Sequence, residues 1–173
     1  MGDSLTTIIA IFLAAVLMFI FPLAAIADRN DDASQMLIKT TLDEFVNKVS
    51  AKGKLTKDDY EKLEAQLLAT NNQYDIELVI NVADVNPGKK SNNTQIGDTT
   101  YYSLYTTQLV GENGVVTSQG AYYLKEGDYI KVSVKNINKT ISQMIKNVLY
   151  GITGNESYVI AGSASGVVVT TGS

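Results

Sequence analysis

An uncharged apolar run of 23 residues, from Leu5 to Ala27, lies near the N-terminus of the chain. As a helix, this run would be about 35 Å long, enough to cross a hydrocarbon core of about 30 Å. All 14 basic residues and all but one of the 18 acidic residues come after it. The sequence therefore predicts an apolar membrane or filament-core helix at residues 1–27, followed by a water-exposed part.

Three interpretations of this run compete. Ala25-Ile26-Ala27 fits the small-x-small pattern of a signal-peptide cleavage site, but residues 1–4 lack the Lys or Arg that usually begins a signal. The second interpretation is a plain membrane anchor. The third is an assembly helix that is buried among copies of itself. Thr6, Ala10 and Ala14 recur every four residues, and such a small-residue stripe lets helices approach closely, so we expect these three residues to make helix packing contacts.

Two further features of the run bear on its geometry. Pro22 lies within it, and because proline removes a backbone donor from a helix, we expect a local bend there. The residues that follow, Asp28 to Asp32, contain three acids and one base. Because cytoplasmic flanks are usually basic, we expect the C-terminal part to be translocated outward, with the protein membrane-inserted before assembly and then at the cell surface.

The next region, residues 28–72, is predicted to be helical. Ile38, Leu42 and Phe45 lie on one apolar stripe at helical spacing, and we expect them to dock the helix onto the following domain. No Gly or Pro separates Ala27 from Val49, so the apolar helix is expected to continue into this one, up to Gly53. Thr56-x-x-Asp59 then predicts the start of a second helix.

The third region, residues 73–173, is predicted to be a β-rich globular domain. Alternating apolar and polar residues predict strands at 74–82, 101–110 and 129–134, with a short strand from Val115. A short helix is expected over 141–149, and two last strands are expected near 158–161 and 167–171, on either side of a bend at 162–166. The expected fold class is α+β, with the helices first and a mainly antiparallel sheet after them.

Composition excludes most chemistry. The chain has no Cys and no His, so thiol nucleophiles, imidazole bases and nearly all zinc sites are ruled out. A net charge of −4 argues against binding to nucleic acid, which needs a basic surface. Ser103, Ser133 and Ser163 have no His partner and no evident Lys base. We therefore expect no enzymatic activity, no catalytic residues, no cofactor and no bound metal.

Some polar and aromatic patterns leave alternatives open. Asp28, Asn30, Asp31 and Asp32 have the oxygen ligands that Ca²⁺ prefers, but a solvated collar at the end of the apolar helix explains them more simply. The ten tyrosines are compatible with an adhesive face, although tyrosine is also a good strand former. The glycosylation pattern Asn-x-Ser/Thr occurs at Asn92, Asn138 and Asn155.

The chain has a short polar leader, followed by an uncharged helix that contains Pro22, an amphipathic continuation and an expected antiparallel sheet. This order resembles that of the type IV pilin-like proteins, including Tad-like pilins. The resemblance implies that hydrophobic helices leave the membrane and bundle into a filament core, with globular domains outside. Pilins commonly have a basic leader and a glutamate early in the helix, whereas this chain has only Gly2-Asp3 there.

These observations predict a structural subunit of an extracellular helical filament, assembled through its N-terminal helices. Its expected partners are further copies of itself, and, before assembly, the membrane and pilus assembly machinery. The alternative is a single-pass, membrane-anchored surface module for binding or adhesion that does not polymerise.

Overall fold

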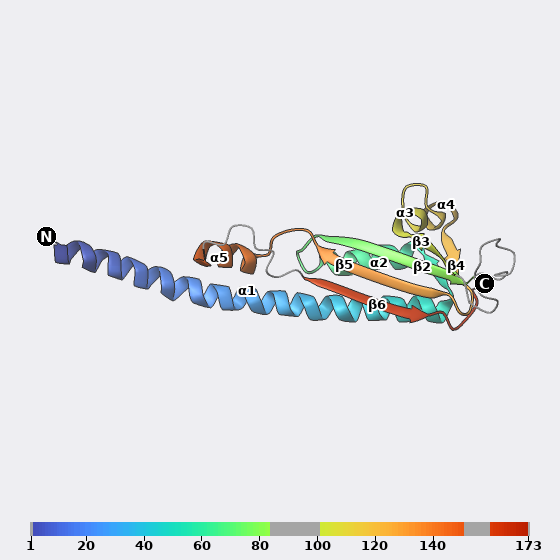
Figure 1. Cartoon of the computed structure of the whole chain (residues 1–173), viewed down its shortest axis with the longest axis horizontal. Helices are drawn as coiled ribbons and strands as arrows, with labels where there is room; N and C mark the ends of the chain where they lie inside the picture. Colours follow the sequence, from blue (N-terminus) through green and yellow to red (C-terminus); the bar gives the residue numbers. More distant parts are fainter. Residues whose placement is uncertain (1, 84–100, 151–159, 173) are drawn as a thin grey trace, which may run out of the picture.

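A computed structural model describes residues 2–83, 101–150 and 160–172. One long helix extends over most of the length of the molecule, and a sheet with shorter helices packs against its C-terminal half (Figure 1). The N-terminus lies at the far end of the long helix, remote from the sheet. The predicted α+β class, with helices first and an antiparallel sheet after them, is confirmed.

The long helix, α1, runs without interruption from Gly2 to Lys52. Its 51 residues correspond to about 76 Å at 1.5 Å per residue. The helix continues through Pro22. The apolar run and the amphipathic stretch that follows it therefore form one element, as expected. The helix ends where predicted, at Gly53, which has a φ of +63° and donates its N–H to the carbonyl of Val49 at 2.9 Å.

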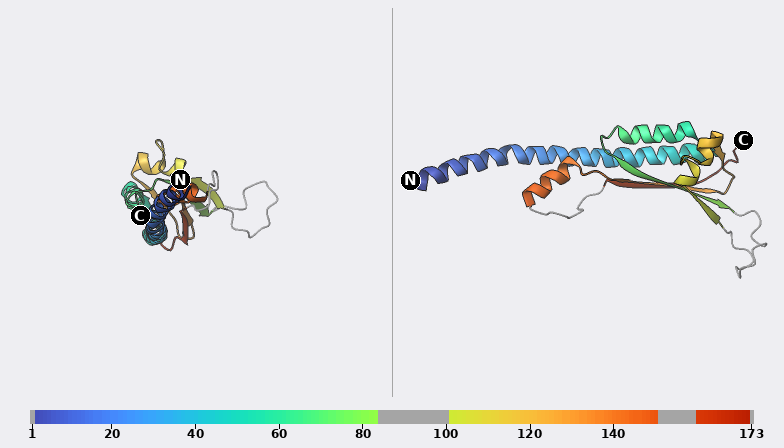
Figure 2. Two further views of the ribbon diagram at one scale, coloured as in Figure 1. Left: turned by 90° about the vertical axis from the view of Figure 1, so that its left-hand side faces the viewer. Right: turned by 90° about the horizontal axis from the view of Figure 1, so that it is seen from above.

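The second helix, α2 (Lys57–Leu68), follows a short strand, β1 (Lys54–Thr56). Thr56 is its N-cap, as predicted, because the threonine hydroxyl accepts a hydrogen bond from the backbone N–H of Asp59. The same hydroxyl donates to the Asp59 carboxylate at 2.7 Å. α2 turns back along the C-terminal half of α1, and the two helices lie side by side on one face of the sheet (Figure 2).

The main sheet has four antiparallel strands in the order β3-β2-β5-β6. Their bounds are β2 Tyr74–Ala83, β3 Tyr101–Tyr105, β5 Tyr129–Asn136 and β6 Ala161–Val167. The register pairs Ile80 with both Leu104 and Ile130, and Val132 with Ala164. A separate two-stranded sheet joins β1 to β4 (Ala121–Tyr123).

One hydrophobic core joins the helices to the sheet. It combines the inner faces of α1, α2 and the strands, and its largest fully buried side chains are Ile38, Leu42, Leu55, Leu63, Leu67, Leu78, Ile80, Leu109, Leu124, Ile130, Ile160 and Val49. The core therefore spans both the predicted helical region, residues 28–72, and the predicted β-rich region, residues 73–173.

The expected strand at residues 101–110 ends early. β3 stops at Tyr105, and residues 106–109 form the short helix α3 (Thr106–Leu109). The side chain of Gln108 accepts a hydrogen bond from the N–H of Tyr105 at 3.0 Å, which closes the first turn of this helix. Thr106 supplies the bond that a longer β3 would have made, because its hydroxyl accepts from the N–H of Leu78 at 2.7 Å.

The strand expected from Val115 is also wrong. Residues 115–119 form a short helix, α4 (Val115–Gln119), and the strand β4 begins only at Ala121. Gly120 separates the two elements with a φ of +82°, a left-handed conformation that ends a helix at little cost for glycine. The β-branched residues at 115–117 favour a strand, but the residues on either side of them favour turns, and the segment is helical.

The bend expected at residues 162–166 is the middle of strand β6 instead. Gly162 and Gly166 point at α1, where a Cβ on Gly162 would lie 2.9 Å from Ile38 Cγ2 and one on Gly166 would lie 2.9 Å from Val46 Cγ1. These residues are small because the helix passes directly over the strand. The expected strand at 167–171 is correspondingly displaced, since β6 ends at Val167, and residues 158 and 159 of the other expected strand lie outside the described residues.

The last helix, α5 (Ile141–Tyr150), is present where the sequence predicts it. It follows β5 and extends beyond the end of the sheet, beside the middle of α1 (Figure 1).

Candidate membrane and assembly surface

The N-terminal half of α1 carries the most extended apolar surface of the described residues. Its N-terminal part projects beyond the sheet and beyond α5 (Figure 1). The run from Leu5 to Ala27 is uncharged, so apolar residues occur on all sides of the helix. Its exposed large apolar residues are Leu5, Ile8, Ile9, Ile11, Phe12, Leu13, Leu17, Met18, Phe19, Phe21, Leu23 and Ile26. By length and composition, this is a helix that could span a membrane.

The residues predicted for helix packing and bending lie within this projecting segment. Thr6, Ala10 and Ala14 are exposed, and their spacing of four places them along one side of the helix. Pro22 is also exposed, and the helix continues through it. The small-residue stripe therefore lies on an exposed part of α1.

The C-terminal half of α1 has a different environment. Ile38 and Leu42 are fully buried, and Phe45 is nearly so. Ile38 and Leu42 contact β6 at Gly162, where the missing side chain leaves room for both. Gln35 adds a polar contact, accepting a hydrogen bond from the N–H of Ala161 at 3.1 Å and donating one to the carbonyl of the same residue. The three residues predicted to dock the domain thus lie on the face of α1 that packs on the sheet.

The two halves of α1 meet at a polar junction with α5. Asp28 is the first charged residue after the apolar run, and it pairs with Lys146 at 2.7 Å while accepting a hydrogen bond from the Ser142 hydroxyl. One turn further, Asp31 accepts a hydrogen bond from the Thr140 hydroxyl at 2.7 Å. These contacts fix the start of α5 to α1 just beyond the apolar segment.

The two carboxylates of the junction differ in their electrostatics. The hydrogen bond from Lys146, together with that from Ser142, lowers the pKa of Asp28 below its usual value. Burial raises the pKa of Asp31, because desolvation there outweighs the hydrogen bond from Thr140. The side chain of Asp28 is partly exposed, whereas Asp31 is only 4% exposed.

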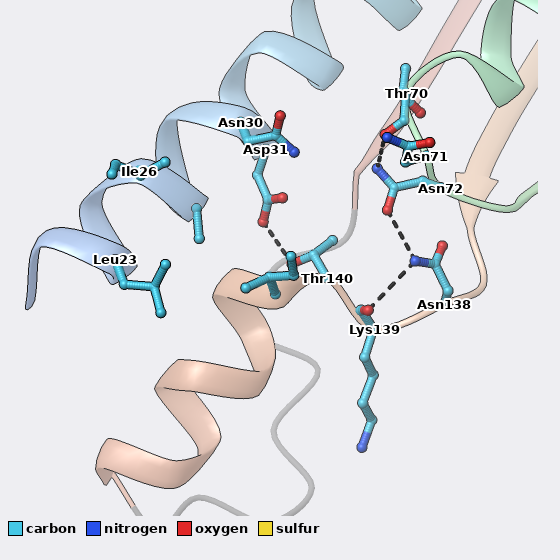
Figure 3. Close-up of a pocket in the computed structure, with 12 residues that line it drawn as sticks. Leu23, Ile26, Asn30, Asp31, Thr70, Asn71, Asn72, Asn138, Lys139 and Thr140 are labelled. Carbon is cyan, nitrogen blue, oxygen red and sulfur yellow. Dashed lines mark hydrogen bonds between the residues drawn. The ribbon is translucent and has the colours of Figure 1, made fainter. Parts of the chain in front are cut away.

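A groove of about 440 Å³ lies next to this junction (Figure 3). One end is apolar and is formed by Leu23, Ile26 and Ile141. The other end is polar and is formed by α1, the segment after α2 and the segment before α5: Asn30, Asp31, Thr70, Asn71, Asn72, Asn138, Lys139 and Thr140. The surface changes from apolar to polar across this groove, at the level where the apolar run ends.

The junction was only partly predictable. The sequence shows the acidic residues after the apolar run, but a solvated collar is wrong for Asp31, which is buried against Thr140. Ser142 and Lys146, more than a hundred residues away, carry no local signal that they contact Asp28. Within the described part of the chain, no group of three or more acidic side chains is arranged to hold a metal ion.

Of the three predicted glycosylation sites, only Asn138 lies among the described residues. Its side-chain nitrogen donates to Asn72 Oδ1 at 3.0 Å, and its oxygen accepts from the N–H of Gln73 at 2.8 Å. A glycan would have to be attached to a nitrogen that already joins two segments of the fold. Asn92 and Asn155 lie outside the described residues.

Exposed tyrosines gather at the opposite end of the molecule. Tyr101, Tyr102 and Tyr105 on β3, and Tyr123 on β4, are each about half exposed. Tyr74 and Tyr122, in contrast, pack against the core. Some tyrosines therefore pack against the core, whereas these four are exposed on strands.

No protein-family model, curated protein or solved structure matches the chain. The arrangement of a long N-terminal apolar helix followed by an antiparallel sheet is nevertheless a pilin-like architecture.

Proposed function

We propose that this protein is a pilin-like structural subunit of an extracellular helical filament, with the N-terminal half of α1 as its assembly element. The observation that carries the proposal is the projection of this segment, apolar on all sides, away from a folded domain. A helix that is hydrophobic all round requires apolar surroundings, either lipid or other helices. Burial of each large apolar side chain contributes about 1.5–3 kcal/mol, so a dozen of them provide a strong driving force.

Two features favour assembly with other copies over permanent anchoring. The stripe of Thr6, Ala10 and Ala14 lets neighbouring helices approach closely, which a lone anchor does not need. Among the described residues, the large apolar side chains from Leu5 to Ile26 are exposed, so this half of α1 is accessible to neighbours. Transfer of such a helix from lipid into a bundle of similar helices exposes little apolar surface to water.

The packing role of the stripe is tested by enlarging one of its residues. Ala10→Leu adds three carbons to the stripe, whereas Ala15→Leu makes the same change nearly on the opposite side of the helix. We expect Ala10→Leu to reduce the yield of fibres from purified full-length protein at least about tenfold, because a loss of about 1.4 kcal/mol per contact already corresponds to that factor. Fibre yield is measured by sedimentation and electron microscopy.

The control and the alternative are judged in the same experiment. Ala15→Leu should assemble like the unmodified chain. An equal yield of fibres from Ala10→Leu would contradict the packing role. If the unmodified protein stays monomeric and forms no fibres, the chain is instead the anchored surface module considered above.

A further inference from the structure

Helix α5 is oriented contrary to what a water-soluble surface requires. Two of its four polar residues, Ser142 and Lys146, contact Asp28 on α1, and Ser142 is only 3% exposed. Ile141, Met144 and Val148, at positions i, i+3 and i+7, form one apolar stripe and are 60%, 49% and 80% exposed. An amphipathic helix on a soluble domain normally buries its apolar stripe and exposes its polar face.

The position of α5 shows what lies next to this stripe. α5 starts beside α1 and runs in the direction of the N-terminal end of α1, slanting away from it in the right view of Figure 2 (Figures 1 and 2). Ile141 lines the groove together with Leu23 and Ile26, so the stripe continues the apolar surface of α1. The groove is also lined by polar residues, which include Asn30 and Asn138.

We propose that α5 is an interfacial helix that lies in the headgroup region of the lipid bilayer, with Ile141, Met144 and Val148 inserted among the acyl chains, while residues 5–27 span the membrane. The inference rests on the membrane-inserted stage of the proposed function. Apolar stripes of interfacial helices insert at this boundary, with polar residues kept at headgroup level.

The contacts with α1 suit this environment. Lys146 and Asp28 neutralise each other at 2.7 Å, which reduces the cost of placing either charge near the boundary. The hydrogen bond from Ser142 satisfies a further lone pair of the same carboxylate. The domain therefore contacts the membrane at two points, α1 and α5, and its orientation relative to the bilayer is fixed.

The absence of tryptophan from the chain allows a direct test. A single tryptophan is introduced by Val148→Trp, and the full-length protein is reconstituted in phosphatidylcholine vesicles with or without brominated acyl chains, which quench tryptophan on contact. Met144→Trp is a second reporter, in case the first variant does not fold. We expect brominated lipid to reduce the emission of either reporter at least about twofold, because both side chains are inserted.

Two further variants make the result specific. Val169→Trp is the matched control, since Val169 is also an exposed valine but lies after β6, at the end of the domain remote from α5. Its emission should be the same in both kinds of vesicle. Phe12→Trp reports separately on the membrane-spanning helix. Quenching at Phe12→Trp without quenching at residues 144 and 148 would overturn the assignment of α5 and leave the spanning helix intact.

A second copy of the chain is the competing occupant of the stripe. If emission from Val148→Trp is insensitive to brominated lipid but shifts to shorter wavelength in lipid-free fibres, the stripe docks on a neighbouring subunit, and the proposal of a lipid contact is wrong. Insensitivity in both settings also overturns it.

Discussion

At the scale of single residues, Gly162 lies at a close approach between α1 and the sheet. The sequence suggested a bend there, because Gly-Ser-Ala-Ser-Gly has the composition of a loop. The residues are instead small because the side chains of Ile38 and Leu42 occupy the space above the strand. Such a contact between residues more than a hundred positions apart leaves no local trace in the sequence.

Replacing this glycine tests the close approach. Gly162→Val places a branched side chain where a Cβ alone would lie 2.9 Å from Ile38 Cγ2, so we expect the free energy of unfolding to fall by about 1–3 kcal/mol. Ser163→Val, on the exposed face of the same strand, should be neutral or slightly stabilising. Urea denaturation followed by circular dichroism measures both. Equal stability of the two variants would contradict the contact.

Asp59 is a second residue whose contacts bear on stability, and the sequence predicted one of these contacts. Its cap with Thr56 was predicted from the spacing, whereas its ion pairs with Lys48 at 2.6 Å and Lys52 at 3.5 Å were not. Burial alone would raise the pKa of Asp59, but the bonds from Lys48 and Thr56 outweigh it and leave the pKa below 3.8.

This shift makes the stability pH-dependent. Because the folded-state pKa lies below the unfolded one, the contribution of Asp59 is complete above pH 3.8 and is lost as the pH falls through the folded value. We expect Asp59→Asn to lower the free energy of unfolding by about 1–3 kcal/mol at neutral pH, with less difference at acidic pH. Urea titrations at several pH values measure it. Asp58→Asn, an exposed neighbour, should show no such pattern, and a pH-independent loss in Asp59→Asn would refute the explanation.

At the scale of elements, apolar periodicity and alternation within one segment predicted most of the helices and strands, and local capping and turn interactions account for two helices that were missed. α1, α2 and α5 follow from apolar periodicity, and β2 and β5 follow from alternation. α3 and α4 were missed because β-branched and aromatic residues favour strands. Their helical turns depend on the bond from Gln108 and on the left-handed Gly120, which outweigh that preference.

The attachment of α5 to α1 gives a prediction at this scale. Asp28→Ala removes the carboxylate that pairs with Lys146 and accepts from Ser142, while the Asp31–Thr140 bond remains. We expect the backbone amides of α5 to exchange with deuterium about fivefold faster, since a partly exposed pair contributes about 1 kcal/mol. Exchange in β2 and β5 should not change.

The control for this prediction is Asp32→Ala, which removes an exposed acid from the same turn. Hydrogen exchange read by mass spectrometry on the full chain in detergent should show unmodified protection of α5 in this variant. Faster exchange in both variants would mean that general loss of negative charge, and not the contact with Lys146, loosens the helix.

At the scale of the whole molecule, the order and type of the parts were predictable because the apolar run and the strand patterns are separated along the chain. The placement of the domain was not, since it depends on where β6 and α5 meet α1. The result is one continuous helix with two environments: one face of its second half is buried on the sheet, and the large apolar side chains of its first half are exposed in the described part of the molecule.

The central claim is that this first half is buried among copies of itself. Electron cryomicroscopy of fibres formed by the purified full-length protein tests it most directly. We predict helical filaments in which residues 5–27 form a central bundle, with Thr6, Ala10 and Ala14 at the contacts between helices and the sheet domains outside. Isolated molecules that never polymerise, or filaments whose axis is formed by the sheet domains, would contradict the account.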